Sequence, residues 1–482
     1  MNLPVTFRRV SKLHQNHRLM NKLLFIITFC CPLFLNAQFY DLEHNLSDEE
    51  KLYGLSQFWS EAKYNFAFFD QTEVNWDSAY QVFIPRVLAT KNTFDYYGEL
   101  QQFCALLKDG HTDVWLPRKI RTGQVYIRVF FKNINQKFYV ENVFNGYAAN
   151  IPIGSQLVKI NGQPAKAYLQ EKIIPYISAS TQHELWNEAI SSWHMHLTDT
   201  TQIVQMEFVR PDGKSANHAA RLHTKTSRGK FAKKSKEWTP FELHQLDNGI
   251  TKIDLNTFSD TMVVTKFVEA LPELYKSKGI IIDLRKNGGG NSGTGAEILK
   301  YFTDQKRLIG SLWQTREHKA AYKAWGTGMV MEENFDGWEQ DDIDWFLEAY
   351  EIGKGIHWYK GDTMTFKNDI TAKKLTVPLI VLFGNNTGSA AEDFLVILDG
   401  LEGRATTIGQ KSFGSTGQPM SFKLPGDAWA RICTKKDTYP DGREFVGYGV
   451  KPDIFVPLNV EEMIGQRDDA LAKAIAVLEG KM

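Results

Sequence analysis

A serine stands where an apolar strand pattern changes into a helix pattern. The run Val377–Phe383 leads through Gly384-Asn-Asn-Thr-Gly388 into Ser389-Ala-Ala-Glu-Asp, and the helical pattern continues to Leu398. A serine on the first turn of such a helix has an exposed hydroxyl among backbone N–H groups that lack partners in the helix. This arrangement suits a nucleophile whose attack creates an oxyanion. The alternative is that Ser389 is only the N-cap of the helix.

A second strand pattern is followed by consecutive glycines. Gly279–Asp283 continues into Leu284-Arg-Lys-Asn-Gly288-Gly289-Gly290. Glycines allow backbone N–H groups to approach a ligand closely, as an oxyanion or a phosphate requires. The spacing through Gly293 also matches the dinucleotide pattern G-x-G-x-x-G, but the next strand candidate, Arg307–Leu312, does not end in the acidic residue that this pattern expects. A nucleotide-dependent α/β enzyme is therefore the weaker alternative.

Four motifs follow one another along the second half of the chain. They are Asp283-Leu-Arg-Lys-Asn-Gly-Gly-Gly290, Thr387-Gly-Ser-Ala-Ala-Glu-Asp-Phe394, Ile408-Gly-Gln-Lys-Ser-Phe-Gly414 and Gly449-Val-Lys-Pro-Asp453. Together they resemble those of the tail-specific, C-terminal-processing serine peptidases, peptidase family S41. The resemblance implies a peptidase in which Ser389 is the nucleophile and the amides of Ala390 and of Gly288 or Gly289 receive the oxyanion. It implies no metal and no organic cofactor.

The residue that serves as general base differs between branches of this family. The processing branch has a catalytic lysine after the Phe-Gly of the third motif, where this chain has Ser415, and Lys411 lies four residues earlier. The tricorn-like branch uses a histidine from the segment before its PDZ-like domain, where this chain has Asp109-Gly-His111-Thr112. The resemblance therefore implies His111 as the base. Because a free imidazole titrates near pH 6.5, we expect the rate to rise through an apparent pKa between about 6 and 7.5.

A histidine base needs an acceptor that orients its other ring nitrogen. Glu444 corresponds roughly to the glutamate of the tricorn-like tetrad and is the predicted partner. Glu392, three residues after Ser389, is the alternative to Glu444 for this role. It could equally be a surface carboxylate that interacts with the dipole at the helix N-terminus. The tricorn-like branch also has a serine beside its histidine, and here only Thr112 offers that hydroxyl.

Two further groups of residues carry weaker signals. His194-Met-His196 would place two imidazoles on one face of a strand, but a third metal ligand is not evident in the sequence. Residues 313–375 contain five tryptophans and an acidic stretch. These rings either line a substrate cleft or fill a core.

The chain divides into three regions by the period of its apolar residues, so the predicted fold class is multidomain α+β. Residues 38–118 form a helical N-terminal domain that carries His111, and its first helix follows the capping box Ser47-Asp-Glu-Glu50. Residues 119–228 alternate with period two, and Ile153–Pro164 resembles the central hairpin of PDZ domains. Residues 235–480 alternate strands and helices, which predicts an α/β catalytic domain; the family resemblance implies a crotonase-like (ClpP-like) sheet there.

The N-terminus has the pattern of a secretory signal. Residues 1–37 carry five basic and no acidic residues, and the apolar run Leu23–Leu35 is shorter than the roughly 20 residues that span a bilayer. We therefore expect an exported protein, periplasmic or extracellular, that has no stable membrane span once this segment is removed. Translation from Met20 would make residues 1–19 an extension. Removal would leave Cys104 and Cys433, whose pairing cannot be read from their spacing.

The composition excludes some classes of function. The chain has 482 residues, 43% of them hydrophobic, with 56 basic and 56 acidic side chains. These are the proportions of a globular protein. The chain has no excess of basic residues, which argues against nucleic-acid binding. The sequence predicts an exported serine endopeptidase that cleaves protein or peptide substrates by a Ser/His mechanism with PDZ-like recognition. The alternative is an inactive peptidase fold that binds a peptide or another ligand; the sequence predicts no oligomeric state.

Overall fold

The protein is described from a computed structural model. The predicted signal segment, residues 1–37, and the pair His194 and His196 lie outside the residues that the structure describes. Those residues are 45–118, 120, 125–193, 203–221, 223–224, 229–234 and 237–481.

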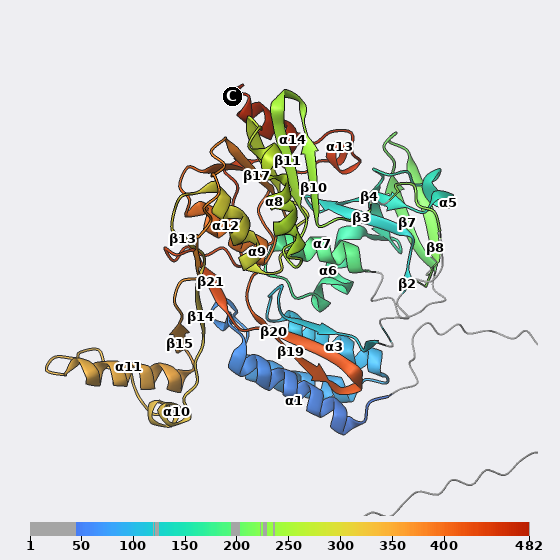
Figure 1. Ribbon diagram of the computed structural model, residues 1–482. Helices are drawn as coiled ribbons and strands as arrows, with labels where there is room; N and C mark the ends of the chain where they lie inside the picture. The colour runs from blue at the N-terminus through green and yellow to red at the C-terminus, as the bar shows by residue number, and fades with distance from the viewer. Residues whose placement is uncertain are drawn as a thin grey trace, which may run out of the picture. The chain divides into compact units, whose positions relative to one another are not determined.

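A six-stranded sheet carries the predicted chemistry at its strand ends (Figure 1). β10 is antiparallel to β11, and the other neighbours in the order β10-β11-β12-β17-β18-β22 are parallel. Residues of α8, α9 and α12 share a core with one face, and residues of α14 pack on the other. Because both faces are covered, β11, β12 and β17 are buried along their whole length. The strands are β10 (Phe241–Gln245), β11 (Ile250–Leu255), β12 (Gly279–Asp283), β17 (Leu379–Phe383), β18 (Ala405–Gly409) and β22 (Ile454–Phe455), and the helices α8 (Met262–Leu274), α9 (Ser292–Leu299), α12 (Ala390–Asp399), α13 (Val460–Met463) and α14 (Asp469–Leu478).

The N-terminal helices do not form a core of their own. Residues of α1 (Asp48–Asn65), α2 (Trp76–Leu88) and α3 (Thr93–Ala105) share one hydrophobic cluster with β19 (Pro419–Leu424) and β20 (Ala428–Cys433). β1 (Asp113–Trp115) then pairs antiparallel with β20, so the segment directly after His111 joins a strand of the C-terminal region. The capping box at the start of α1 is confirmed: the Glu50 amide donates to the Ser47 Oγ, and the Ser47 amide donates to the Glu50 carboxylate.

Residues 125–224 build a second sheet with its own core. The strand order is β3-β4-β5-β7-β8, with β6 paired to β5, and β3 is an edge strand. Helix α7 (Gln182–Ser192) packs beside β3. The remaining elements are β2 (Val125–Tyr126), β3 (Val129–Ile134), β4 (Lys137–Val143), α5 (Asn145–Ala148), β5 (Gln156–Ile160), β6 (Gln163–Pro164), α6 (Ala165–Lys172), β7 (Ile203–Val209), β8 (Ser215–Arg221) and β9 (His223–Thr224).

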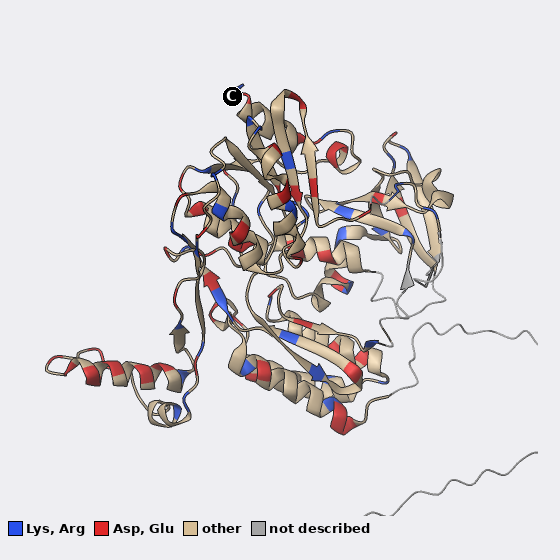
Figure 2. Ribbon diagram, in the orientation of Figure 1, with Lys and Arg blue, Asp and Glu red and all other residues tan. Residues whose placement is uncertain are grey.

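The tryptophan-rich region is a hairpin of two helices inserted between paired strands. β14 (Leu312–Arg316) pairs with β15 (Trp358–Lys360) on one side and with β21 (Lys436–Thr438) on the other. α10 (Ala320–Gly326) and α11 (Gln340–Lys354) lie between β14 and β15 in the chain, and acidic residues are spaced along α11 (Figure 2). The short strands β13 (Arg307–Ile309) and β16 (Thr365–Lys367) pair antiparallel.

The prediction of a mixed fold with several sheets is confirmed. Cys104 and Cys433 are both buried free thiols, which answers the question that their spacing left open. Among the described residues, no helix has the length and apolar character that crossing a membrane requires.

Candidate active site

Ser389 has a strained backbone at the start of α12. Its φ of 54° and ψ of −129° lie outside the regions that residues other than glycine usually adopt. The strain is held by hydrogen bonds, since the Ser389 amide donates to the Ser415 carbonyl at 3.1 Å and to the Glu392 carboxylate at 3.2 Å. A strained serine between a buried strand and a helix is the geometry of a nucleophile elbow.

The glycine-rich loop after β12 touches this serine. A Cβ added at Gly289, where φ is +105°, would lie 2.6 Å from the Ser389 Cβ, so only glycine allows this approach. The Gly289 amide already donates to the Asn287 Oδ1 at 2.9 Å. Within the described part of the chain, the amides of Gly288 and Ala390 have no hydrogen-bond partner. Of the three predicted oxyanion donors, these two are free to bind a ligand.

His111 is buried and its side chain contacts that of Ser415. Its Nδ1 lies 2.7 Å from the Ser415 Oγ, and 9% of the residue is exposed. Burial lowers the pKa of His111 to about 4, and the positive charges of Arg431 and Lys435 act in the same direction. The imidazole is therefore neutral at neutral pH, as a general base must be.

Asp109 lies behind this pair. Its carboxylate accepts hydrogen bonds from the Thr112 hydroxyl at 2.6 Å and from the His111 amide at 3.2 Å, and the Ser415 Oγ lies 3.5 Å from its Oδ1. Burial raises the pKa of Asp109 to about 6, and the hydroxyl of Thr112 opposes this shift. The Thr112 hydroxyl also accepts from the Cys433 amide at 3.0 Å. Thr112 thus fixes Asp109, and the hydroxyl beside the imidazole belongs to Ser415.

Glu392 is fully buried, so it is not the surface carboxylate that the sequence left as an alternative. It accepts from the Ser412 hydroxyl, from the amides of Gly414 and Ser415 at 2.7 and 3.1 Å, and from the Ser389 amide. Burial raises its pKa to about 8, and these donors act against that shift. Glu392 therefore joins Ser389 to the loop that carries Ser415, the partner of His111.

The other predicted residues lie elsewhere. The Glu444 carboxylate is 40% exposed and pairs with the Lys436 ammonium at 3.3 Å, and no hydrogen bond among the described residues joins it to His111. The exposed Lys411 accepts a hydrogen bond from the Asn385 side chain through its carbonyl. Within the part of the chain that the structure describes, the Lys411 ammonium makes no ion pair.

The start of α7 holds both the histidine segment and the Ser415 loop. The Thr181 hydroxyl donates to the Phe413 carbonyl at 2.9 Å, and the His183 Nε2 lies 2.8 Å from the Ser412 carbonyl. The Ser180 hydroxyl accepts from the Gly110 amide at 2.9 Å. Sequence reasoning missed these contacts, because their only local signal is the second capping box, Thr181 with Glu184.

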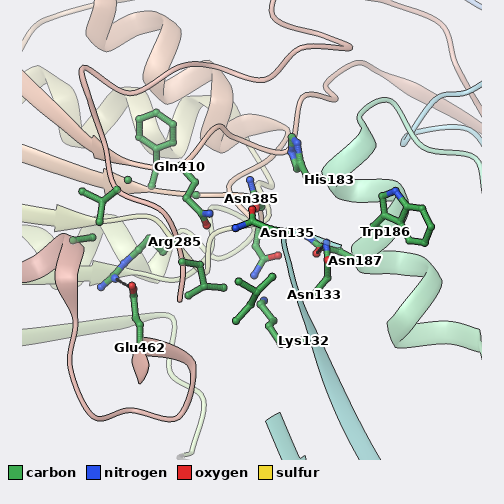
Figure 3. A pocket seen from close by; sticks show the side chains of 18 of the residues that line it. Lys132, Asn133, Asn135, His183, Trp186, Asn187, Arg285, Asn385, Gln410 and Glu462 are labelled. Atoms are coloured by element: carbon green, nitrogen blue, oxygen red, sulfur yellow. Dashed lines mark hydrogen bonds and ion pairs between the residues drawn. The ribbon is translucent and has the colours of Figure 1, made fainter. Parts of the chain in front are cut away.

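Two cavities that share lining residues lie between α7, β3 and the loops of the large sheet, and Figure 3 shows the first of them. The first, of about 400 Å³, is lined by amide side chains of Asn133 and Asn135 from the β3–β4 hairpin, Asn187 from α7, and Asn385 and Gln410 from the strand ends. The second, of about 500 Å³, shares Asn133, Asn187 and Asn385 and extends to Gly110, beside His111. The two cavities thus share part of their lining, and the second reaches the segment that carries His111.

Elsewhere, Glu242, His244 and Asp254 bring three potential metal-ligand atoms within 4.8 Å of one another on β10 and β11. The Lys252 ammonium already pairs with Asp254. This group lies on the antiparallel strand pair, and none of its members contacts Ser389 or His111 by a hydrogen bond of the described residues.

The contacts of Glu392 generate a stability prediction. Glu392→Gln replaces one acceptor oxygen by an NH₂ group that must face two donors of the Ser389 and Ser415 segments. Leaving buried donors unpaired costs about 1–3 kcal/mol. Urea unfolding above about pH 9, where Glu392 is ionised despite its raised pKa, should therefore show a loss of about this size, whereas the exposed control Glu402→Gln should be neutral. An unchanged unfolding free energy in Glu392→Gln would remove Glu392 from this structural role.

Comparisons with known proteins agree with the motifs. The model of peptidase family S41 matches residues 249–456. The carboxy-terminal-processing protease of Bartonella bacilliformis is 26% identical over 220 residues, which are 45% of this chain and 40% of that protein. The carboxyl-terminal-processing protease of Picosynechococcus sp. is 23% identical over 405 residues, 83% of this chain and 81% of that protein. The chain thus spans less than half of the first relative and most of the second.

A similar fold occurs among solved structures. Mature CPAF complexed with lactacystin superposes with a TM-score of 0.66 at 13% sequence identity, over 90% of this chain and 99% of that one. At this identity the likeness concerns the fold alone. The findings agree on one point: residues 249–456 match peptidase family S41, and both relatives that the chain resembles are carboxy-terminal-processing proteases.

Proposed function

We propose that this protein is an exported endopeptidase in which Ser389 is the nucleophile, His111 the general base, and Ser415 with Asp109 the group that orients the base. The observation that carries the proposal is the hydrogen bond between the His111 Nδ1 and the Ser415 Oγ. Because the Ser415 carbonyl also accepts from the Ser389 amide, one residue contacts both the base and the nucleophile. Export rests on the signal pattern of residues 1–37.

The contacts of His111 specify how the proton moves. If Nδ1 carries the hydrogen and donates it to Ser415, the Nε2 is unprotonated and accepts the proton of the Ser389 hydroxyl. The Ser389 Oγ then bonds to the carbonyl carbon, and the amides of Gly288 and Ala390 bind the oxyanion. On collapse the C–N bond breaks, His111 returns the proton to the leaving amine, and water hydrolyses the acyl-enzyme by the reverse transfers.

This assignment differs from the sequence prediction in the residue that orients the base. Glu444 was expected there, but its carboxylate pairs with Lys436. In its place Ser415 accepts from the imidazole and can donate onward to Asp109 at 3.5 Å. In the processing branch, the position of Ser415 holds a lysine base. Here it holds a hydroxyl that we propose orients His111, which supports the tricorn-like mechanism predicted from the sequence.

Substrate recognition is proposed for the groove between β3 and α7, in the manner of a PDZ-like domain. β3 is an edge strand, so an extended peptide can add to it through main-chain hydrogen bonds. The Asn133 side chain on β3 donates to the Asn187 side chain on α7 at 3.0 Å across this groove. The second cavity is lined by Asn133 and Asn187 of this groove and also by Gly110. A peptide bound in the groove therefore extends toward the segment that carries His111.

The nucleophile and base are tested by substitution. Ser389→Ala should abolish cleavage of an unfolded protein and labelling by a fluorophosphonate, because the attacking oxygen is lost. His111→Ala should remove most activity, and Lys411→Ala should leave it nearly unchanged. Ser415→Ala should lower kcat by about 10²-fold or more, as when a base loses its correct tautomer. Labelling retained in Ser389→Ala, or activity lost in Lys411→Ala, would contradict the assignment.

The pH dependence gives an independent test. Protonation of His111, with a pKa lowered to about 4, and of Asp109, with a pKa raised to about 6, both disable the base as the pH falls. The value of kcat/KM should therefore be constant above about pH 7 and decrease between about pH 6 and 4. This limb lies lower than the range expected for a free imidazole. A limb centred above pH 7 would indicate a lysine base.

The groove is tested by filling it. Asn187→Trp places a large ring between α7 and β3 and should lower kcat/KM for a protein with a free apolar C-terminus at least tenfold. Cleavage of a short chromogenic peptide should change little. Glu171→Trp, on the exposed surface of α6, is the matched control. Equal losses on both substrates in Asn187→Trp would argue against recognition through this groove.

A further inference from the structure

The helical hairpin between β14 and β15 is a closely packed unit. Gly326 at the end of α10 lies against the backbone of Ala349 and Gly353 in α11, where a Cβ would find no space. Its base is attached to α1, because the His318 Nε2 lies 2.7 Å from the Tyr64 carbonyl. The hairpin is therefore a defined surface on the protein.

This surface exposes large aromatic rings. Trp325 is 52% exposed, Trp338 42% and Trp345 39%. The rings of Trp325 and Trp345 lie 5.8 Å apart, and Trp338 packs on Phe346 at 5.7 Å. The rings are thus fixed in place yet accessible. Exposed apolar side chains that cluster in this way mark interaction sites, whereas scattered ones do not.

The same surface is strongly acidic (Figure 2). Residues 317–355 contain ten acidic and three basic side chains. The carboxylates around Trp338 have no ion-pair partner among the described residues, unlike Glu348, which pairs with Lys319. These unpaired residues are Glu332, Glu333, Asp336, Glu339, Asp341, Asp342 and Asp344.

We propose that the α10–α11 hairpin binds lysine- or arginine-rich segments of polypeptide substrates. A cationic side chain is attracted both by an indole face and by the unpaired carboxylates beside it. The same negative charge disfavours contact between the hairpins of two copies of this chain. The assignment of the bound segment to a substrate rests on the proposed peptidase function.

The hairpin connects directly to the catalytic loop. β14 pairs with β21, and the Asp437 carboxylate on β21 accepts from the Thr416 hydroxyl at 2.6 Å. Thr416 follows Ser415, the partner of His111. A segment held on the hairpin is therefore tethered to the part of the chain that forms the active site, which raises its effective concentration there.

Binding is measured on the full chain with Ser389→Ala, so the result does not depend on cleavage. The probes are a fluorescein-labelled short peptide of alternating lysine and alanine and its counterpart of alternating glutamate and alanine. Fluorescence anisotropy should detect binding of the lysine peptide only, weakened about tenfold or more between ~50 and ~300 mM salt. Adding Glu332→Gln, Glu333→Gln and Glu339→Gln should weaken it by about the same factor, and Trp338→Ala should do so independently.

A matched variant removes the same number of charges elsewhere. Glu73→Gln, Glu237→Gln and Glu402→Gln are exposed and outside the hairpin, and should leave peptide binding unchanged. In the active enzyme, the hairpin variant should lower kcat/KM for a basic unfolded protein but not for a short neutral peptide. Equal binding of both probes, equal loss in both triple variants, or a change of oligomeric mass without lysine-peptide binding would overturn the proposal.

Discussion

The candidate active site depends on the pairing of β1 with β20. Arg431 on β20 is opposite Asp113 on β1, and its guanidinium donates to the Asp113 carboxylate at 2.7 Å and to the Gly110 carbonyl at 3.3 Å. This pairing brings a segment near residue 110 to a loop about 300 positions later in the chain, where His111 meets Ser415. Residues of α1, α3 and β20 share one hydrophobic core, which supports the pairing, so the position of His111 depends on how the N-terminal helices pack.

The loop 412–415 is the second requirement, and it is held from three sides. Glu392 accepts its amides, α7 binds its carbonyls, and His111 binds its hydroxyl. The loop has little regular structure, so its backbone groups must be paired by side chains or remain unpaired in a buried place. This need explains why a glutamate can be fully buried one turn into α12. It also means that α7, which borders the proposed substrate groove, contributes directly to the geometry of the base.

The sequence predicted those features whose signals are local. The strand–serine–helix pattern located Ser389, the glycine run located the loop beside it, and the capping box located the start of α1. Which carboxylate or hydroxyl meets His111 is a tertiary property, because its candidates come from segments hundreds of residues apart. Glu444 resembled the expected partner by position in the chain, but its side chain pairs with Lys436. Ser415 was noticed only as a missing lysine, since a hydroxyl has no sequence signal of its own.

Ser415 stands where the resemblance to the processing peptidases leads us to expect a lysine, and this difference bears on the electrostatics of the proposed base. A lysine base must lose its proton near neutral pH, which requires its pKa to fall by several units through burial. Here the positive charges that act on His111 are those of Arg431 and Lys435, and each is paired with a carboxylate: Arg431 with Asp113, and Lys435 with Asp437 at 3.0 Å. They help to keep the imidazole neutral at no cost to its role. The hydroxyl of Ser415 adds no charge, so the base can be buried beside Asp109 without an unpaired ammonium. Burial, aided by these two charges, lowers the pKa of His111, so the proposed base is neutral and able to accept a proton near neutral pH.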